Sequence, residues 1–266
     1  MAKKSGEKNL RRWVIKAGSA MVCTGGPILL RSWMQQVVIL KKNHNIEVIW
    51  VTSGAISSAV DRVGIIKSRN KWDLSEKQAL SAMGQPILMD LYNLALHSTG
   101  LMGAQVLLTY TDLADKKRRN NFQQTVEQLL NWKVVPILNE NDAVATEEIK
   151  FGDNDSLSAK VAVAMAAERL IILTDVEGLF DKDPKKYVGA NLVQRIATVT
   201  PKLLSSVGSH SGSQQGTGGM YSKLKAAKEA SSRGVETLLV KGDASSVLIK
   251  IAENNFLGTT IQAKRK

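Results

Sequence analysis

The stretch VVPILNENDAVATEEIKFGDNDSLSAKVAVAMAAERLIILTD, residues 134–175, decides the fold. It begins with an apolar run over 134–138, passes through a polar segment into a helical pattern over 155–167, and ends in a second apolar run over 169–174. Short apolar runs that alternate with helical patterns are typical of parallel strands with helical crossovers. This stretch therefore predicts an α/β protein whose mostly parallel sheet is covered by helices on both faces.

The same alternation continues over the rest of the chain. A proline, Pro86, falls inside one expected helix, where it removes a backbone hydrogen bond and favours a bend. The Gly- and Ser-rich stretch 206–219 is expected to be a mobile loop. Strands are expected at 13–16, 47–51, 104–109, 134–138, 169–174, 236–240 and 259–262, and helices at 27–42, 75–99, 119–131, 155–167, 220–233 and 245–253.

The composition bounds the class of protein. The 266 residues, 44 % of them hydrophobic, suit one large α/β domain or two small ones with a real core. The single cysteine, Cys23, excludes a disulfide framework and a cysteine-based zinc site. No apolar run reaches the roughly 18 residues of a membrane span, and Lys16 and Gly18 interrupt the apolar stretch where a signal peptide would need one. We therefore expect a soluble, cytoplasmic protein without a membrane partner.

The net charge of +12 attracts polyanions. It is compatible with nucleic acid, with a phosphorylated small molecule, or with a merely basic surface. Much of the excess lies at the two ends of the chain and in KKRR, 116–119, and such runs are usually solvated. Few aromatic residues alternate with them, so no stacking platform for single strands is evident. We expect no specific nucleic-acid binding.

Polar residues follow four of the expected strands at their carboxyl ends. In open α/β sheets ligands bind beyond these ends, so the exits at 16–19, 52–55, 139–142 and 175 predict one site at one edge of the sheet. The residues 153–155, Asp-Asn-Asp, stand at the start of the helix over 155–167. One such side chain is enough for a helix cap. Three exceed that need, and we expect this helix start to join the site.

Two lysines have positions that an anion would explain. Lys16 directly follows a buried-looking strand, where an unpaired charge is costly; either it extends to solvent or it holds its ammonium over a phosphate, beside the N–H groups of Gly18 and Ser19. Lys223 lies in the first turn of a helix that begins near Gly219, where a cation opposes the helix dipole. An anion bound at that N-terminus would make the position favourable.

Several familiar catalytic schemes do not fit. The sequence has no GxxxxGK[ST] motif, no HRD or DFG motif, and no GxGxxG after the first strand. The three histidines, His44, His97 and His210, lie outside the polar segments, which leaves little support for a Ser-His-Asp triad or a histidine-rich metal site. Two lysines, glycine-rich turns and a few carboxylates suit phosphoryl transfer, in which the protein mainly positions groups and neutralises charge.

Seven segments, in order from about residue 12 to about residue 262, resemble the amino acid kinase family, and within it the kinases that phosphorylate glutamate. They are KAGS, VTSGA, KQALSAMGQP, QVLLT, VPILNENDAVATEEIKFGDND, LTDVEGLFDKDP and GTGGMYSKLKAA. The resemblance implies a three-layer α/β/α sandwich with a mostly parallel central sheet. It also implies ATP-dependent phosphorylation of the side-chain carboxylate of L-glutamate, the first step toward proline, with Mg²⁺ carried by the nucleotide phosphates and no metal ligand from the protein.

The resemblance also assigns roles by position. Lys16, Asp155 and Lys223 would be catalytic, with Asp155 orienting the two lysines. The glutamate-binding positions would be Ser53, Gly54, Asn139, Asp142, Lys150 and Asn154. The nucleotide-binding positions would be Lys16, Thr174, Asp175, Thr217, Gly218, Gly219, Met220, Tyr221, Ser222 and Lys223.

Some features depart from the family pattern or leave alternatives open. The usual RxNARNT reads here as RRNNFQQT, 118–125, with Gln123 in place of an arginine. We expect a kinase domain over 12–262 between basic tails at 1–11 and 263–266, no C-terminal PUA domain, a homo-oligomer, and the next enzyme of the proline pathway as a candidate partner. A non-catalytic nucleotide- or RNA-binding protein on the same fold, and a related kinase of different specificity, stay as alternatives. The presence of Lys16, Asp155 and Lys223 together favours the kinase.

Overall fold

A computed structural model describes residues 10–64, 72–145, 154–184, 186–210 and 219–264, and within these ranges the strands form one eight-stranded sheet. The sheet order is β3-β4-β2-β1-β5-β7-β8-β6. The first six strands of that order are parallel, whereas β8 runs antiparallel to β7 and β6 follows the direction of β8. The strands are β1 (Arg11–Ala17), β2 (Ile46–Val51), β3 (Gly103–Leu108), β4 (Val135–Glu140), β5 (Arg169–Thr174), β6 (Arg195–Ile196), β7 (Glu236–Lys241) and β8 (Gly258–Ile261).

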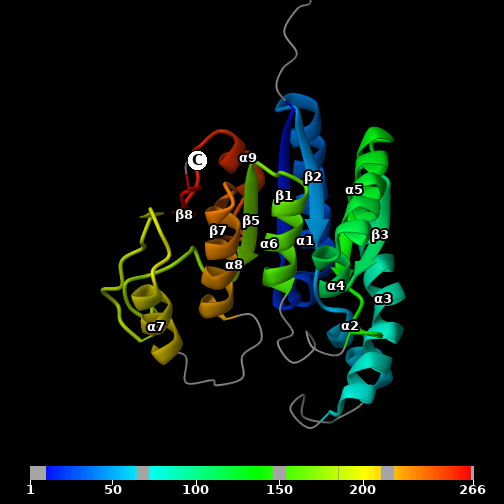
Figure 1. The fold of residues 1–266 in the computed structure, drawn as a ribbon, viewed down its shortest axis with the longest axis horizontal. Helices are drawn as coiled ribbons and strands as arrows, with labels where there is room; N and C mark the ends of the chain where they lie inside the picture. Colours follow the sequence, from blue (N-terminus) through cyan, green and yellow to red (C-terminus); the bar gives the residue numbers. More distant parts are fainter. Residues whose placement is uncertain (1–9, 65–71, 146–153, 185, 211–218, 265–266) are drawn as a thin grey trace, which may run out of the picture.

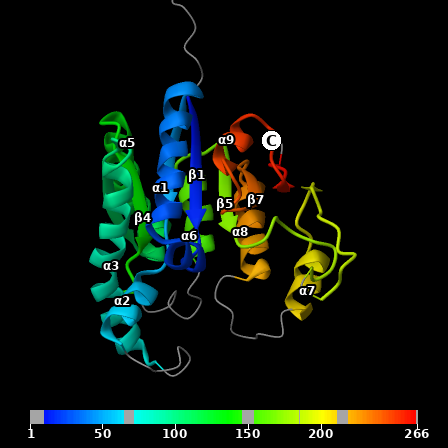
Figure 2. The same cartoon turned by 180° about the vertical axis from the view of Figure 1, so that it is seen from behind.

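Helices cover both faces of the sheet, as Figures 1 and 2 show from opposite sides. Helices α1, α3 and α9 pack on one face, and α5, α6 and α8 pack on the other. The predicted three-layer α/β/α sandwich with a mostly parallel sheet is confirmed. The helices are α1 (Ser19–Asn43), α2 (Ala55–Val63), α3 (Leu74–His97), α4 (Tyr110–Ala114), α5 (Lys116–Asn131), α6 (Asn154–Ala164), α7 (Pro201–His210), α8 (Met220–Ser232) and α9 (Val247–Ala252).

Two hydrophobic cores lie between the layers. Because successive side chains of a strand point to opposite faces, β1 sends Trp13 and Ile15 to the core under α1 and α3, and Val14 to the core under α6 and α8. The first core holds the largest buried side chains of the described residues, and the rings of Trp33 and Trp50 lie 5.5 Å apart in it. The central strands are therefore buried on both sides, as their unbroken apolar runs predict.

Several boundaries differ from the sequence prediction. Strand β4 continues to Glu140, two residues beyond the expected end, so that Asn139 and Glu140 belong to the strand. The first helix was expected at 27–42 but begins at Ser19. Its backbone breaks at Gly26, with φ 52° and ψ −154°, just before Pro27, a residue that favours the first position of a helix. The predicted start at residue 27 is therefore the start of the second half of α1 only.

Three helices and one strand were not predicted. Helices α2 and α4 are short, and β6 has two residues that are held by pairing with β8. Helix α7 runs to His210, so the loop expected over 206–219 is wrong for its first five residues, while 211–218 lie outside the described residues. Gln123, the departure from the family motif, lies on α5 and donates from Nε2 to the carbonyl of Ala164 at the end of α6. It ties two helices of one layer together.

The edge of the sheet at the amino ends of the strands is closed by ion pairs. Arg12 contacts Glu47 at 2.7 Å and Glu127 at 2.6 Å, and Arg11 contacts Glu168 at 2.7 Å. The opposite edge, where β1, β2, β4 and β5 end, is the one that holds a cavity. None of the helices in the described part of the chain combines the length and apolar character that a bilayer crossing requires.

Candidate active site

The cavity has a volume of about 260 Å³ and lies at the carboxyl ends of the four central strands. All four predicted strand exits contribute to its walls, together with the start of α6. The structure therefore brings the four predicted strand exits together around one cavity at one edge of the sheet. The predicted residues that line the cavity are Lys16, Ser53, Gly54, Asn139, Asp142, Asn154, Thr174, Asp175 and Lys223.

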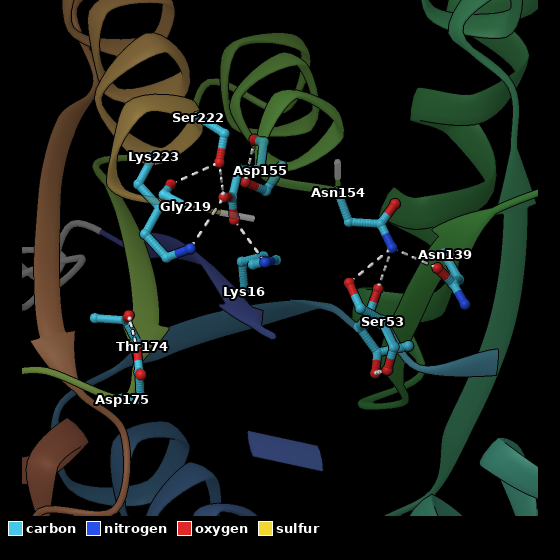
Figure 3. A network of polar contacts seen from close by, with 12 residues as sticks. Lys16, Ser53, Asn139, Asn154, Asp155, Thr174, Asp175, Gly219, Ser222 and Lys223 are labelled. Carbon is cyan, nitrogen blue, oxygen red and sulfur yellow. Dashed lines mark hydrogen bonds and ion pairs between the residues drawn. The ribbon is translucent and has the colours of Figure 1, made fainter. Parts of the chain in front are cut away.

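Asp155 lies behind the cavity wall and connects the two lysines. Lys16 Nζ is 2.5 Å from Asp155 Oδ1, and Lys223 Nζ is 3.4 Å from Oδ2 (Figure 3). The exposed fractions are 0 % for Asp155, 4 % for Lys16 and 6 % for Lys223. Ser222 adds a hydrogen bond from its hydroxyl to Asp155 Oδ2 at 2.9 Å. Residues 16 and 223, at opposite ends of the chain, thus meet around one buried carboxylate.

The electrostatics of Asp155 follow from this environment. Burial by itself raises the pKa of a carboxyl group, because it disfavours the charged form. The charges of Lys16 and Lys223 act in the opposite direction and prevail, so the pKa of Asp155 lies well below its usual range. The aspartate is an anion at any working pH and holds the two ammonium groups at fixed positions. Two cations beside one anion leave the cluster with a net positive charge at the cavity wall.

Three helix N-termini add to the positive potential. Helix α1 begins after Gly18, α2 after Gly54 and α8 after Gly219, and in each helix no side chain caps the N-terminus and no acidic residue lies in the first turn. Free N–H groups and the positive end of the helix dipole favour anions there. The first residues of α1 and α2 line the cavity. The part of the cavity beside Lys16, Lys223 and the start of α1 is therefore suited to bind phosphate groups.

A second polar cluster surrounds Asn154 at the first residue of α6. Its Nδ2 lies 2.7 Å from the carbonyl oxygen of Thr52, 2.9 Å from Ser53 Oγ and 2.7 Å from Asn139 Oδ1. These neighbours include a backbone carbonyl, which fixes the orientation of the amide. Ser53 Oγ is the acceptor in its contact with Asn154, and a hydroxyl can accept and donate at the same time, so Ser53 is able to donate its own proton to a ligand. Figure 3 shows this cluster apart from the one around Asp155.

Carboxylates complete this second cluster. Asp142 lines the cavity and accepts a hydrogen bond from Ser81 Oγ at 2.9 Å, and Glu140, from the same strand exit as Asn139, lines it as well. Gly54 follows Ser53 in the wall of the cavity. Its φ of 114° is a conformation that glycine adopts without strain, and a side chain there would approach Cys23 Sγ to 3.2 Å. The cavity thus has a cationic part and a part with carboxylates and amides.

The predicted nucleotide positions fall into three groups. Thr174, the last residue of β5, donates to Asp175 Oδ1 at 3.1 Å, and both line the cavity below Lys223 (Figure 3). The start of α8 carries the second group, Gly219, Met220, Tyr221 and Ser222. Met220 packs against the core and Tyr221 is exposed. None of the four lines the cavity that the described residues form. Thr217 and Gly218 form the third group and lie outside the described residues, as does Lys150, which was predicted as a glutamate-binding position.

Some cavity residues were missed in the sequence prediction. Glu140 lies in the predicted strand exit 139–142. The first turns of α1 and α2 were not predicted as helices. The first residues of α1 and α2 line the cavity because these helices begin directly after Gly18 and Gly54, within a few residues of the ends of β1 and β2. The lining residues that the prediction missed are Ala20, Met21, Ile56 and Leu173, whereas Gly18, Ser19, Ala55 and Glu140 were predicted as parts of the strand exits without a role assigned by the resemblance.

The donor set of the described residues does not suit a protein-bound metal. Among the described residues, no group of three or more His, Cys, Asp or Glu side chains is arranged to hold a metal ion. The most buried carboxylate, Asp155, is compensated by two ammonium groups, which would repel a divalent cation. The cationic part of the cavity suits an anionic group such as a phosphate instead.

Comparison with known proteins gives consistent matches. The model of the amino acid kinase family matches residues 11–242. The chain is 40 % identical to a glutamate 5-kinase of Caldanaerobacter subterraneus subsp. tengcongensis over 253 residues, and 42 % identical to one of Burkholderia thailandensis over 258 residues. These matches cover 94 % and 96 % of this chain, and 67 % and 68 % of the two relatives. The chain therefore spans about two thirds of the length of these relatives.

Proposed function

The chain belongs to the amino acid kinase family, and from this membership and the geometry of the cavity we propose that it transfers the γ-phosphoryl group of ATP to the side-chain carboxylate of L-glutamate. The product is L-glutamyl 5-phosphate, the first intermediate toward proline. The relatives that support this assignment are named glutamate 5-kinases and match nearly the whole of this chain. The cavity supports it independently, because one part suits a polyphosphate and the other an amino acid.

The acceptor amino acid would bind in the part of the cavity around Asn154. Asp142 would pair with the substrate ammonium, and Ser53 would donate its hydroxyl proton to a substrate oxygen. Asn139 and Asn154 hold each other in position at 2.7 Å and would contact the remaining polar groups. Gly54 leaves room for a ligand beside the start of α2, and Lys150 is proposed as a further contact by position in the family motif only.

The nucleotide would bind in the cationic part. The start of α8, with Gly219 and Lys223, would hold the phosphates together with Lys16, and the resemblance adds Thr217, Gly218, Met220, Tyr221 and Ser222 as nucleotide contacts. Thr174 and Asp175 would contact the nucleotide at the end of β5. Asp155 would keep both ammonium groups directed at the transferring phosphoryl group, since each of its oxygens already faces one of them.

The reaction needs little covalent help from the protein. A carboxylate of the substrate, already ionised at neutral pH, attacks the γ-phosphorus; the new O–P bond forms as the bond to the β,γ-bridging oxygen breaks, and ADP leaves with the electron pair. No proton must be removed, which agrees with a described site that contains no histidine. Both reactants are anions, and the two lysines and the helix N-termini would lower the barrier by stabilising the charge on the phosphoryl oxygens. Mg²⁺ on the nucleotide phosphates would supply further neutralisation.

The observation that carries this proposal is the convergence of Lys16 and Lys223 on the buried Asp155 beside the acceptor cluster. The test is a substrate panel with ATP and Mg²⁺: glutamate, aspartate, acetylglutamate and UMP, with ADP release measured and acyl phosphates trapped by hydroxylamine. We expect ADP release and a hydroxamate with glutamate above all. Turnover of another acceptor alone would indicate a different specificity, and no turnover with any would favour a non-catalytic binding protein.

A further inference from the structure

Helix α3 carries three buried polar side chains on one face. Ser81, Gln85 and Tyr92 are 1 %, 7 % and 0 % exposed, and their spacing of four and then seven residues places them along one side of the helix. None of them lines the cavity as formed by the described residues. Buried polar groups require hydrogen-bond partners. Each of these three side chains has a partner in the wall of the cavity or in Thr52 beside it. Gln85 Oε1 also accepts from Gln105 Nε2 on β3 at 2.7 Å, and Tyr92 also accepts from Trp50 in β2.

Tyr92 is connected to the exit of β2. Trp50 Nε1 donates to the Tyr92 hydroxyl at 2.8 Å, and the hydroxyl donates in turn to Thr52 Oγ1 at 2.8 Å. An indole N–H can only donate, so the direction of this chain is fixed. The pKa of Tyr92 is raised by burial, which keeps the phenol protonated as a donor. Thr52 is the residue whose carbonyl oxygen holds the amide of Asn154, and it directly precedes Ser53.

Gln85 and Ser81 are connected to the exit of β4. Gln85 Oε1 accepts from Asn139 Nδ2 at 3.3 Å, and Gln85 Nε2 donates to the carbonyl of Glu140 at 3.4 Å. Ser81 donates to Asp142 Oδ2 at 2.9 Å. The three side chains of α3 therefore act on Thr52, Asn139 with Glu140, and Asp142. These are the segments that carry the acceptor side of the cavity.

Gly84 brings α3 close enough for these contacts. A side chain at this position would place its Cβ 1.8 Å from the carbonyl oxygen of Ala55, in the first turn of α2. Glycine thus lets the backbone of α3 touch the turn that follows Ser53 and Gly54. The other part of the cavity has a different support, since Lys16, Asp155 and Lys223 come from β1, α6 and α8, and α6 packs directly on α8.

We infer that Ser81, Gln85 and Tyr92 are positioning residues for the acceptor half of the active site. The inference rests on the proposed function in that it takes this half to bind the phosphoryl acceptor. The three side chains do not touch the substrate; they fix the side chains that do. Loss of one of these hydrogen bonds should therefore weaken acceptor binding, while nucleotide binding, which depends on the other half, stays unchanged.

The test compares two buried glutamines. Gln85→Met keeps the length of the side chain and removes its polar atoms. Gln36→Met is the matched control, because Gln36 is 5 % exposed, lies on α1, and accepts from the backbone N–H of Leu248 at 2.8 Å, away from the cavity. Tyr92→Phe is the second variant. For each protein, the KM for acceptor, the KM for ATP, kcat and Tm are measured with the acceptor that wild type turns over.

We expect Gln85→Met and Tyr92→Phe to raise the acceptor KM about 2- to 10-fold, the range of one lost hydrogen bond, with the ATP KM unchanged. Gln36→Met should lower Tm without changing the acceptor KM. If Gln85→Met and Tyr92→Phe lowered Tm and left both KM values as in wild type, or shifted both equally, the three residues would have only a structural role. Failure of the proposed function is a separate result. If wild type turned over an acceptor other than glutamate, the same comparison with that acceptor would still decide the role of α3. If wild type turned over none, dissociation constants for glutamate and ATP measured by calorimetry would replace the two KM values, and unchanged glutamate affinity in Gln85→Met and Tyr92→Phe would contradict the inference.

Discussion

At the scale of single residues, the most constrained group is Asp155. It is fully buried, and its two oxygens face two lysines that are also almost fully buried. Buried charges are tolerated when they are paired and hydrogen-bonded. In this cluster one carboxylate is paired with two ammonium groups, which leaves one positive charge in excess. An anionic ligand balances that excess, which is the physical reason to expect phosphate beside it.

Replacing either lysine by methionine should slow the chemical step. Lys16→Met and Lys223→Met keep most of the side-chain volume and remove a charge that stabilises the transition state more than the ground state. We expect kcat to fall about 10²-fold or more, the scale of one lost transition-state donor. Lys228→Met, at an exposed position of the same helix α8, is the control. A kcat near that of wild type in Lys223→Met would make Lys223 an ordinary helix residue.

Asp142 should determine affinity for the acceptor. Asp142→Ala removes the carboxylate proposed to pair with the substrate ammonium. A hydrogen bond to a charged group contributes about 1.5–3 kcal/mol, so the KM for glutamate should rise about 10- to 150-fold. The KM for ATP should change far less. Steady-state kinetics with each substrate varied will decide, with Asp90→Ala at an exposed position of α3 as control, and equal changes in both KM values would contradict the assignment.

The ion pairs of Asp155 should make stability depend on pH in the acid range. The pKa of Asp155 in the folded protein lies below its ordinary value of 3.8, so the stabilisation is fully present above pH 3.8 and decreases as the pH falls further toward the lowered pKa. Asp155→Asn leaves two buried ammonium groups without their anion, which should cost about 3–5 kcal/mol at neutral pH.

Urea unfolding at several pH values tests this prediction. The difference in free energy of unfolding between wild type and Asp155→Asn should be constant from pH 7 to about pH 5 and should narrow below about pH 4. Asp61→Asn, at an exposed position of α2, should show no comparable difference at any pH. If the difference in free energy of unfolding between wild type and Asp155→Asn increased below pH 4, the lysines would not stabilise the carboxylate.

At the scale of elements, each half of the site depends on a pair of packed helices. Helices α6 and α8 present Asp155 and Lys223 to each other, and a second ion pair, between Lys160 and Glu229 at 2.8 Å, joins the same two helices further along. Helices α2 and α3 touch at Ala55 and Gly84. The spacing within each pair sets distances between side chains that no single element determines.

Gly84→Ala should therefore disturb the second pair. The new Cβ would lie 1.8 Å from the Ala55 carbonyl oxygen, which is backbone and must move together with α2. We expect a loss of about 1–3 kcal/mol in the free energy of unfolding, typical of overpacking, and a raised KM for the acceptor. Gly189→Ala is the control, because no atom lies within 4 Å of a Cβ built there. Equal stability of the two variants, measured by urea unfolding, would show that the contact is loose.

At the scale of the whole molecule, the net charge of +12 should act as a general attraction for anions. Binding to DNA or RNA should be weak, with dissociation constants of about 10⁻⁴–10⁻⁶ M at physiological salt, and should weaken steeply as salt is added. Fluorescence anisotropy with labelled oligonucleotides over a salt series measures this. Tight, sequence-selective binding at physiological salt would contradict the prediction and support a nucleic-acid-binding role.

The sequence by itself determined the layers of the fold and the edge that carries the site. Apolar runs of strand length must be buried on both faces, and parallel strands bring their carboxyl ends to one edge. This logic depends on local pattern, so it placed the exits of β1, β2, β4 and β5 correctly. It also identified Lys16 and Lys223 as unusual, because a charge after a buried strand and a cation at a helix start are locally unfavourable. The same local logic failed for α2, α4, α7 and β6, which are short or depend on contacts with neighbouring elements.

Only the tertiary structure decided which of these residues meet. The packing of helices on the sheet brings Lys16 and Lys223 to the same carboxylate, Asp155. It also gives Thr52, Asn139 and Asp142 each a hydrogen bond with a polar side chain of α3. The sequence pattern does not predict that Ser81, Gln85 and Tyr92 are buried, because a polar residue on a helix is expected to be exposed unless its hydrogen-bond partners are known. Hydrogen bonds and ion pairs depend on distances of a few ångströms between segments far apart in the chain, and these distances exist only once both hydrophobic cores have formed.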